Sequence, residues 1–179
     1  MALRLVCLFA VAGVACVGAV ASAAHRTRAA ATSARIPALP ARNESRTGRC
    51  PIPARFRPAF ERAARDAGLQ LSMLVAVAQV ESEFKPDAHS DADAHGLLQV
   101  MPTTAAELNL DVDKPSSNVL AGARYLKLML NRFPRTDLAL AAYNAGPTIV
   151  TKLGRAPTRE TQTYIANVQQ RWAALAGCD

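Results

Sequence analysis

The sequence predicts an all-α fold, a compact domain of six or seven helices, over residues 50–179. Apolar residues recur there at spacings of three and four positions, and no segment shows the sustained alternation of a β-strand. Proline and glycine residues stand where such helices would begin and end. No internal repeat is evident, and the region is long enough for one domain with a sizeable core.

Residues 1–24 have the pattern of a secretory signal peptide. A single cation, Arg4, precedes an apolar stretch over residues 5–20, and small residues follow it. A retained membrane anchor is the weaker alternative, because the stretch is shorter than the ~20 residues that a span needs. A lipoprotein signal at Cys16 is a further alternative. We therefore expect export, with cleavage near residues 23–24.

Residues 25–49 form a basic segment with six Arg, one Glu and two large aliphatic side chains. Such a segment cannot bury enough apolar surface to fold, so we predict a flexible linker. It supplies most of the chain's net charge of +7, because residues 50–179 hold 14 basic and 13 acidic residues. A nearly neutral folded region is not typical of nucleic-acid binding. The linker is either a solvated spacer or a contact to anionic envelope polymers and lipid surfaces.

The first two helices are predicted from their ends and their polarity. A helix over residues 58–67 would begin with a proline and end before Gly68. A second would run over residues 72–83, with Ser72 as its N-cap and Pro86 beyond its end. This second helix is apolar on nearly every side, which indicates that it is buried.

A polar loop through residues 90–96 leads to the rest of the fold. Four further helices are expected to begin at Thr104, Asn118, Thr136 and Thr158. In the short first one, Thr104 and Glu107 have the spacing of a capping box, and Asn118 is the expected N-cap of the second. The second would end at Pro134, and the third at Gly146.

Glu81 is the candidate catalytic residue, because it stands at the last turn of the predicted buried helix. Burial and the negative end of a helix both disfavour a charged carboxylate, so the pKa of Glu81 should be raised. General acid catalysis at neutral pH needs such a carboxyl group. Glycoside hydrolysis usually needs a second carboxylate, but Glu83 should point elsewhere on the helix. The remaining local candidates, Asp87, Asp91 and Asp93, lie in a loop of turn-forming residues.

Four ordered motifs resemble those of the lytic transglycosylase domain, a family of the lysozyme-like superfamily (glycoside hydrolase family 23). They are Glu-Ser-x-Phe at 81–84 with Ser90 and Gly-Leu-x-Gln-x-Met-Pro at 96–102, Asn-x-x-Ala-Gly-x-x-Tyr-Leu at 118–126, Ala-Tyr-Asn-Ala-Gly at 142–146, and Glu160-Thr161 with Tyr164. The resemblance covers roughly residues 55–172 and implies a lysozyme-like helical domain. Two residues depart from the family pattern. Leu98 stands where Met is usual, and Asp93 stands where Gly is usual, at a position expected to need positive φ.

The resemblance implies a peptidoglycan lytic transglycosylase that uses Glu81 as its single general acid and base and needs no cofactor. Tyr143 would donate a hydrogen bond to Glu81, and Ser90 and Gln99 would hold the N-acetyl group or the reacting sugar. Asn144 would fix the backbone of its own motif. Local roles as turn formers or helix caps remain alternatives for Ser90, Gln99 and Asn144. The other candidate substrate-binding residues are Met101, Glu160 and Tyr164.

Two other functions remain open at this point. One is hydrolysis by a goose-type lysozyme-like muramidase. The other is a non-catalytic wall-binding component of a secretion apparatus, with the basic linker as its docking segment. The expected partner in each case is the peptidoglycan glycan strand, the expected location is the periplasm or the cell exterior, and the expected state is a monomer.

The four cysteines predict one disulfide. Two of them lie in the predicted signal peptide, whereas Cys50 and Cys178 flank the helical region. In an exported chain, such a pair most simply joins the two ends of the domain. We expect no metal site, because His89 and His95 lie six residues apart in a loop, without the spacing of a zinc motif.

Overall fold

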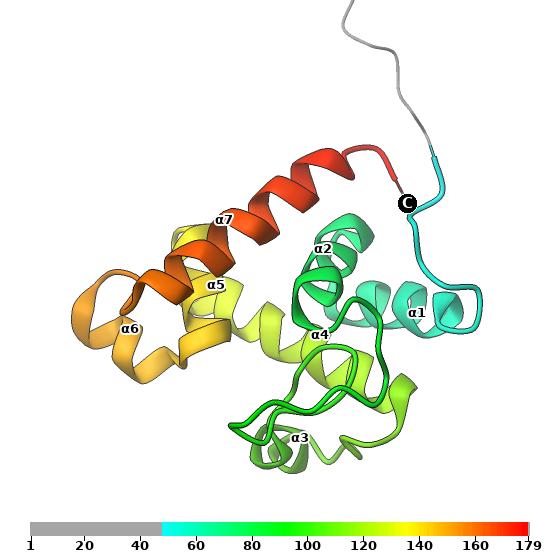
Figure 1. Ribbon diagram of the computed structural model, residues 1–179, viewed down its shortest axis with the longest axis horizontal. Helices are drawn as coiled ribbons and strands as arrows, with labels where there is room; N and C mark the ends of the chain where they lie inside the picture. Colours follow the sequence, from blue (N-terminus) through cyan, green and yellow to red (C-terminus); the bar gives the residue numbers. More distant parts are fainter. Residues whose placement is uncertain (1–47, 179) are drawn as a thin grey trace, which may run out of the picture. The chain divides into compact units, whose positions relative to one another are not determined.

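The computed structural model describes residues 48–178, which contain seven α-helices (Figure 1). The helices are α1 (Arg57–Ala67), α2 (Leu71–Glu81), α3 (Pro102–Glu107), α4 (Pro115–Arg132), α5 (Thr136–Ala145), α6 (Pro147–Leu153) and α7 (Arg159–Ala174). Within these residues there is no β-strand, only isolated bridges in the loop between α2 and α3. The predicted all-α class is therefore confirmed.

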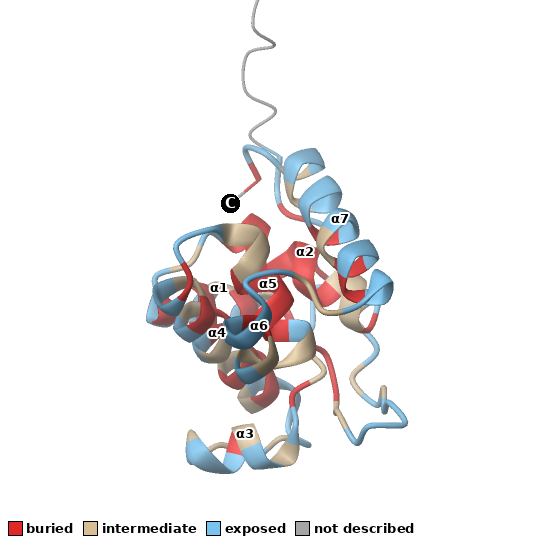
Figure 2. Cartoon of the chain, turned by 90° about the vertical axis from the view of Figure 1, so that its left-hand side faces the viewer, coloured by how far each residue is buried: buried red, intermediate tan, exposed pale blue. Residues whose placement is uncertain are grey.

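The helix α2 forms the centre of the core. It packs against α1 on one side and α7 on the other, and every residue from Leu71 to Ala78 is buried (Figure 2). Because neighbours surround it, α2 has no polar face, as its sequence predicts. Burial becomes partial from Gln79 onward, so α2 carries its last residue, Glu81, from the core to the edge of the core.

Several predicted helix ends are confirmed. The helix α1 has a proline in its first turn and ends at Gly68, which adopts the left-handed conformation at φ 61°. The helix α5 begins at Thr136, as predicted. At the start of α7, the Thr158 hydroxyl accepts a hydrogen bond from the backbone N–H of Thr161 at 3.0 Å. These ends follow local sequence signals that tertiary packing does not override.

Three predicted N-caps are wrong. The helix α3 begins at Pro102 and α4 begins at Pro115, so Thr104 and Asn118 lie inside these helices. A proline in the first turn has the φ of a helix already set, and it starts both helices earlier than the polar residues would. The helix α2 begins at Leu71, and the buried side chain of Ser72 makes no capping hydrogen bond.

Two further boundaries differ from the prediction. The helix α2 ends at Glu81 rather than residue 83, because Glu83 and Phe84 have φ values of 51° and 62°, outside the right-handed helical region. The short helix α6 is not predicted from the sequence, where Gly146 indicates only the end of the preceding helix. Gly146 turns the chain at φ 88°, and Pro147 is in the first turn of α6.

The two ends of the described region meet at a disulfide. Cys50 and Cys178 are bonded with their Cα atoms 4.8 Å apart, as predicted. Among the helices of residues 48–178, none combines the length and apolar character that crossing a membrane requires. The predicted signal peptide and nearly all of the predicted basic linker lie outside the described residues.

Candidate active site

Glu81 is a partly buried carboxyl group at the end of α2. Burial raises its pKa from 4.5 to about 7, although a hydrogen bond from Tyr164 acts in the opposite direction. The raised pKa matches the expectation from the sequence. At neutral pH a large fraction of Glu81 therefore carries the proton that general acid catalysis requires.

Tyr164, on α7, holds the Glu81 carboxyl group. Its hydroxyl donates a hydrogen bond of 2.7 Å to Glu81 Oε1. Burial raises the pKa of Tyr164 well above 10, so this hydroxyl stays protonated and remains a donor. A protonated carboxyl group has one acceptor oxygen and one O–H. Because Oε1 accepts from Tyr164, the transferable proton belongs on Oε2.

The expected hydrogen bond from Tyr143 to Glu81 is wrong. The Tyr143 hydroxyl instead donates to the backbone carbonyl of Leu98 at 2.8 Å. Tyr143 is buried near the end of α5, and this bond ties α5 to the segment that precedes α3. Tyr164, which the sequence suggested as a substrate-binding residue, takes the position beside Glu81.

A groove of about 430 Å³ opens at Glu81. It is lined by side chains from the end of α2, the loop before α3, the end of α5 and the start of α7: Glu81, Ser90, Ala92, Ala94, Gln99, Met101, Tyr143, Asn144, Ala145, Thr158, Glu160 and Thr161. An adjoining cavity of about 250 Å³ shares five lining residues with it, Gln99, Met101, Tyr143, Asn144 and Ala145, and its other lining residues include Tyr125. The structure thus brings together all the predicted substrate-binding residues except Tyr164, which contacts Glu81 directly.

Two buried polar side chains fix the loop segment that forms one wall of this groove. Asn118 accepts a hydrogen bond from Leu98 N at 2.9 Å and donates to the carbonyl oxygens of His95 and Val112 at 2.8 and 3.0 Å. The Ser82 hydroxyl, just past Glu81, donates to the Leu97 carbonyl at 2.8 Å. The role of Asn118 is therefore to satisfy buried backbone groups of the loop, rather than to cap a helix.

Gly122 allows α4 to approach the same segment. A Cβ atom at this position would lie 2.4 Å from Leu98 Cβ and 2.6 Å from Leu98 Cγ. It would also lie 3.1 Å from the Tyr143 hydroxyl. The Asn-x-x-Ala-Gly motif therefore acts through its two ends, since Asn118 binds the loop and Gly122 leaves room for it.

Gln99 has a strained backbone conformation, and the amide nitrogen of its side chain already makes two hydrogen bonds. Its φ is 44°, a value that non-glycine residues rarely adopt outside functional or tightly constrained sites. Its side-chain nitrogen donates to the carbonyl oxygens of Ala88 and Gly96, each at 3.0 Å. These two bonds use both amide hydrogens, so Gln99 presents an acceptor oxygen to a ligand.

The candidate second carboxylates do not lie in the groove. Asp87, Asp91 and Asp93 are exposed, and none of them lines the cavity at Glu81. Among the groove-lining residues of the described chain, Glu160 is the one carboxylate besides Glu81. Glu160 is exposed in the first turn of α7.

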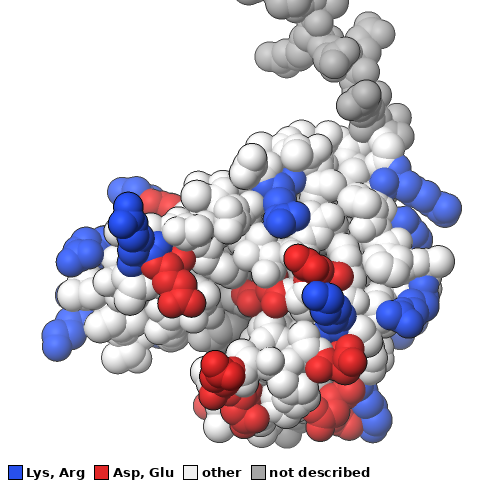
Figure 3. Space-filling view, viewed as in Figure 1, with Lys and Arg blue, Asp and Glu red and all other residues white. Residues whose placement is uncertain are grey.

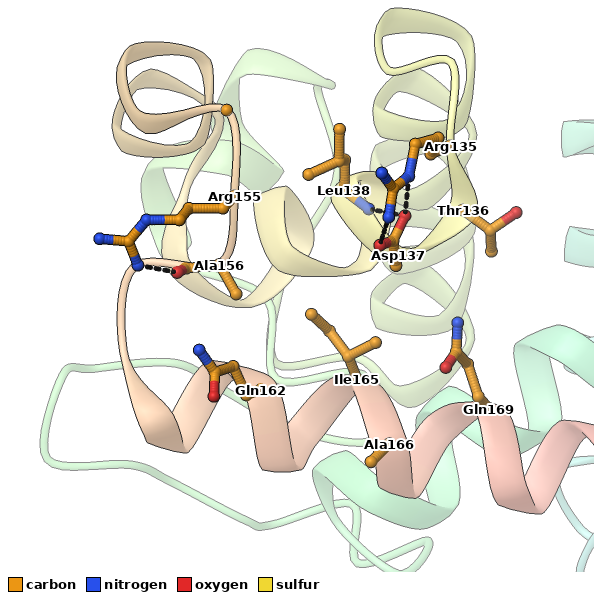
Figure 4. Close-up of a pocket in the computed structure, with 11 residues that line it drawn as sticks. Arg135, Thr136, Asp137, Leu138, Arg155, Ala156, Gln162, Ile165, Ala166 and Gln169 are labelled. Carbon is orange, nitrogen blue, oxygen red and sulfur yellow. Dashed lines mark hydrogen bonds and ion pairs between the residues drawn. The ribbon is translucent and has the colours of Figure 1, made fainter.

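A larger cavity, about 680 Å³, lies between the start of α5, the segment before α7 and one side of α7 (Figure 4). Its charged residues already have partners. Arg135 forms an ion pair with Asp137, which lowers the pKa of Asp137, and the Arg155 guanidinium donates to the Ala156 carbonyl. Size alone does not make this cavity the active site, because it contains no group with a pKa suited to acid catalysis.

The loop between α2 and α3 also contains a histidine with two carboxylate partners. His95 Nδ1 lies 2.8 Å from Asp113 Oδ1, and His95 Nε2 lies 3.0 Å from Asp93 Oδ1. The hydrogen bond with Asp93 has the largest effect on the pKa of His95 and raises it, and the hydrogen bond with Asp113 acts in the same direction. Asp93 has φ 66°, which confirms the positive φ expected at this position. The rings of His89 and His95 lie 4.0 Å apart between centroids, a pairing that their sequence spacing did not suggest.

Comparison with known proteins identifies the family. Residues 58–165 match the family model described as the Transglycosylase SLT domain, and this match covers more than half of the chain. The chain belongs to the Transglycosylase SLT domain family. The family match contains the Glu-Ser-x-Phe, Gly-Leu-x-Gln and Ala-Tyr-Asn-Ala-Gly motifs that supply the groove, which confirms the resemblance found in the sequence.

Sequence similarity to individual proteins supports the assignment to the SLT domain family. The chain is 41% identical over 132 residues to membrane-bound lytic murein transglycosylase F of Desulfosudis oleivorans, with 68% of this chain and 27% of the relative covered. It is 30% identical over 143 residues to the soluble lytic murein transglycosylase of Salmonella typhimurium, with 65% and 22% covered.

The fold of the SLT domain matches a solved structure, that of an inactive mutant of lytic transglycosylase Slt from Pseudomonas aeruginosa. The TM-score is 0.61 at 30% identity, and the match covers 69% of this chain and 25% of that one. The predicted lysozyme-like helical domain is thereby confirmed. The chain spans about a quarter of the length of these relatives.

Proposed function

We propose that this chain is an exported peptidoglycan lytic transglycosylase. As such, it is a lyase that cleaves the β-1,4 bond between N-acetylmuramic acid and N-acetylglucosamine and leaves 1,6-anhydromuramyl ends. The observation that carries the proposal is Glu81, whose pKa is raised to about 7 by burial and whose carboxyl group opens into a groove lined by the family motifs. The names of the similar proteins, which are lytic transglycosylases, support the same activity.

In the proposed reaction, Glu81 acts first as an acid and then as a base. Its protonated Oε2 donates a proton to the glycosidic oxygen while the bond from that oxygen to C1 of the muramic acid breaks. The Glu81 carboxylate then takes the proton of the sugar's own 6-hydroxyl as O6 forms a bond with C1. Glu81 ends protonated again, and the reaction consumes no water and no cofactor.

The other groove residues bind and orient the sugar in this proposal. The acceptor oxygen of Gln99 suits an N–H or O–H of the substrate, because both of its amide hydrogens are used by the loop. Ser90 accepts a hydrogen bond from Ala94 N at 3.0 Å, and its own hydroxyl hydrogen remains a donor for the N-acetyl group. Met101, Asn144 and Glu160 complete the walls of the groove.

The test of the acid role is Glu81→Gln, which keeps the shape of the side chain and removes the transferable proton. We expect loss of nearly all turnover on purified cell-wall sacculi, with an unchanged circular dichroism spectrum. Glu83→Gln is the matched control, because Glu83 is exposed and pairs only with Lys85. Near-normal release of sugar fragments by Glu81→Gln would remove Glu81 from this role.

Hydrolysis by a goose-type lysozyme-like mechanism is the second candidate, and the carboxylate of Glu160 in the groove wall is the observation that favours it. The mass of the products separates the two reactions, because a 1,6-anhydro end lacks one water. Mass spectrometry of digested sacculi should give anhydro ends throughout. Reducing ends as the main product would support hydrolysis, with Glu160 as the residue that positions water.

Location and partners follow from the same proposal. An exported enzyme of this kind acts on glycan strands in the periplasm or outside the cell, as a monomer, and can also serve a secretion apparatus by opening the wall. A non-catalytic wall-binding component would bind sacculi without releasing soluble fragments. Co-sedimentation with sacculi, measured together with fragment release, distinguishes these two roles.

A further inference from the structure

Two histidines and an aspartate gather on the loop between α2 and α3, outside the groove lining. His89, Asp93 and His95 each place one possible metal-ligand atom within 4.8 Å of the other two. The chain has only one other histidine, His25. Nothing in the proposed glycan chemistry uses this cluster.

The backbone of the loop explains why the two histidines meet. Gly96 N donates to Ala88 O at 2.8 Å, and Ser90 N donates to Ala94 O at 3.0 Å. These bonds flank an antiparallel bridge between His89 and His95. The two histidines form a pair without hydrogen bonds between them, which is the arrangement that brings opposite side chains closest. Neighbouring residues of an extended strand face opposite ways, so Ser90 lines the groove while His89 does not.

The carboxylates are placed as a metal site requires. Asp93, at φ 66° in the turn, directs Oδ1 to within 3.0 Å of His95 Nε2. The other ring nitrogen, Nδ1, is held by Asp113 at 2.8 Å. A histidine that binds a metal almost always donates its second N–H to such a carboxylate, which fixes the tautomer and orients the ring. Asp113 already occupies that position.

The charge around the loop favours a cation. Residues 81–113 contain eight acidic residues and one basic residue, Lys85. On the face shown in Figure 3, acidic side chains gather over the lower part, where the loops around α3 lie, while most basic side chains stand at the edges. Two imidazole nitrogens and one carboxylate oxygen are the ligands of open tetrahedral zinc sites.

Although the spacing of the two histidines in the sequence predicts no metal site, we propose from their arrangement in the fold that His89, Asp93 and His95 bind a divalent transition-metal ion such as Zn²⁺, with Asp113 orienting His95. The ion takes the place of the proton on His95 Nε2 and bridges Asp93, His95 and His89. The possible ligand atoms now lie within 4.8 Å of one another. Because the side chains of His89 and Asp93 are exposed, they can move until each ligand atom reaches bonding distance from one ion. The bound ion would join the two bridged segments of the loop and the turn between them, and the same loop carries Ser90 into the groove.

The test uses the full chain, purified without a polyhistidine tag, and titrated with ZnCl2 or MgCl2 by calorimetry. We expect one Zn²⁺ per chain and no detectable binding of Mg²⁺, which prefers oxygen ligands. The melting temperature should rise with the Zn²⁺ concentration. Amide exchange at Ala94 and Gly96 should slow. The measurement is independent of the proposed activity, because it can be repeated in Glu81→Gln with the same expected result.

Three variants and two controls assign the ligands. His89→Gln and Asp93→Asn should each weaken Zn²⁺ binding at least tenfold, and asparagine tolerates the positive φ of position 93. Asp113→Asn should weaken it by about 10- to 100-fold, as expected for a group that orients a ligand. Asp91→Asn, with the same charge change in the same loop, and His25→Gln should stay within twofold of the wild type. Absence of Zn²⁺ binding, or equal losses in Asp91→Asn and Asp93→Asn, would overturn the proposal.

Discussion

At the residue scale, the position of Glu81 gives it the proton needed for acid chemistry but makes its charged form costly. The carboxyl group titrates at about 7 in the folded chain and at 4.5 in the reference state. The folded state therefore binds this proton more tightly than the unfolded state, and stability falls as pH rises between these two values. Above about pH 7 the free energy of unfolding has lost the whole contribution of this proton. The shift from 4.5 to about 7, at about 1.36 kcal/mol per pKa unit, makes this loss on the order of 3 kcal/mol.

This linkage gives a prediction for Glu81→Gln, whose side chain is neutral at every pH. The variant and the wild type should differ little in free energy of unfolding at pH 4.5. At pH 8 the variant should be the more stable by up to about 3 kcal/mol, because it does not bury a charge. Urea denaturation of both proteins at the two pH values measures the difference. A difference that does not change with pH would contradict the raised pKa.

The second prediction at this scale concerns Tyr164, which positions the Glu81 carboxyl group. The hydrogen bond from Tyr164 lowers the pKa of Glu81, so Tyr164→Phe should raise that pKa further. If Glu81 must be protonated, the alkaline limb of kcat/KM should move to higher pH, while kcat falls because the carboxyl group loses its fixed orientation.

The control for this experiment is Tyr125→Phe. Tyr125 packs its ring 5.4 Å from that of Tyr143 and lines the adjoining cavity, but it does not contact Glu81 through a hydrogen bond. Its replacement should leave the alkaline limb in place. A limb that stays unchanged in Tyr164→Phe as well would show that this hydroxyl does not act on Glu81.

At the element scale, α4 holds the loop segment that forms one wall of the groove, through Asn118 and Gly122. Asn118 satisfies Leu98 N and the carbonyl groups of His95 and Val112, which lie on the two sides of α3. In Asn118→Ala, Leu98 N and Val112 O would lose this partner, whereas His95 O would keep the hydrogen bond from Val100 N. Each unsatisfied buried group costs about 1–3 kcal/mol, so we expect a loss of at least about 2 kcal/mol in the free energy of unfolding.

Asn131 offers a matched control, because it is an exposed asparagine on the same helix. Asn131→Ala should change the free energy of unfolding by no more than about 0.5 kcal/mol. Denaturant titration of the two variants measures both values. Equal stability of Asn118→Ala and Asn131→Ala would mean that the loop finds other partners for its backbone groups.

At the scale of the whole molecule, the disulfide closes almost the entire described region into one loop. Cys50 and Cys178 are separated by 128 residues, and neither lines the groove at Glu81. A cross-link over such a loop stabilises by up to about 4.7 kcal/mol in the chain-entropy model, and usually by less. The variant with both Cys50→Ser and Cys178→Ser should therefore have a lower melting temperature than the wild type, and it should keep its activity at temperatures where it remains folded.

Calorimetry and sacculus digestion at low temperature test this prediction together. A parallel loss of activity at a temperature where the variant is fully folded would mean that the bridge also shapes the groove. An unchanged melting temperature would show that the ends of the domain hold together without the bond.

The sequence by itself determined the helical class, the carboxyl group at the end of a buried helix and the pairing of Cys50 with Cys178, whereas the predicted groove residues came from the family resemblance. These features depend on local periodicity, on proline and glycine signals, and on which residues flank the domain. Even so, two N-caps were assigned wrongly where a nearby proline starts the helix earlier.

Only the tertiary structure decided which side chains meet. Tyr164 reaches Glu81 across 83 residues of chain, and Tyr143 reaches the Leu98 carbonyl across 45. Asn118 binds the loop rather than capping α4, and a backbone bridge places His89 opposite His95. A sequence pattern gives the face of a helix, but the partner of a hydroxyl or an amide depends on how helices pack, and no local signal encodes that.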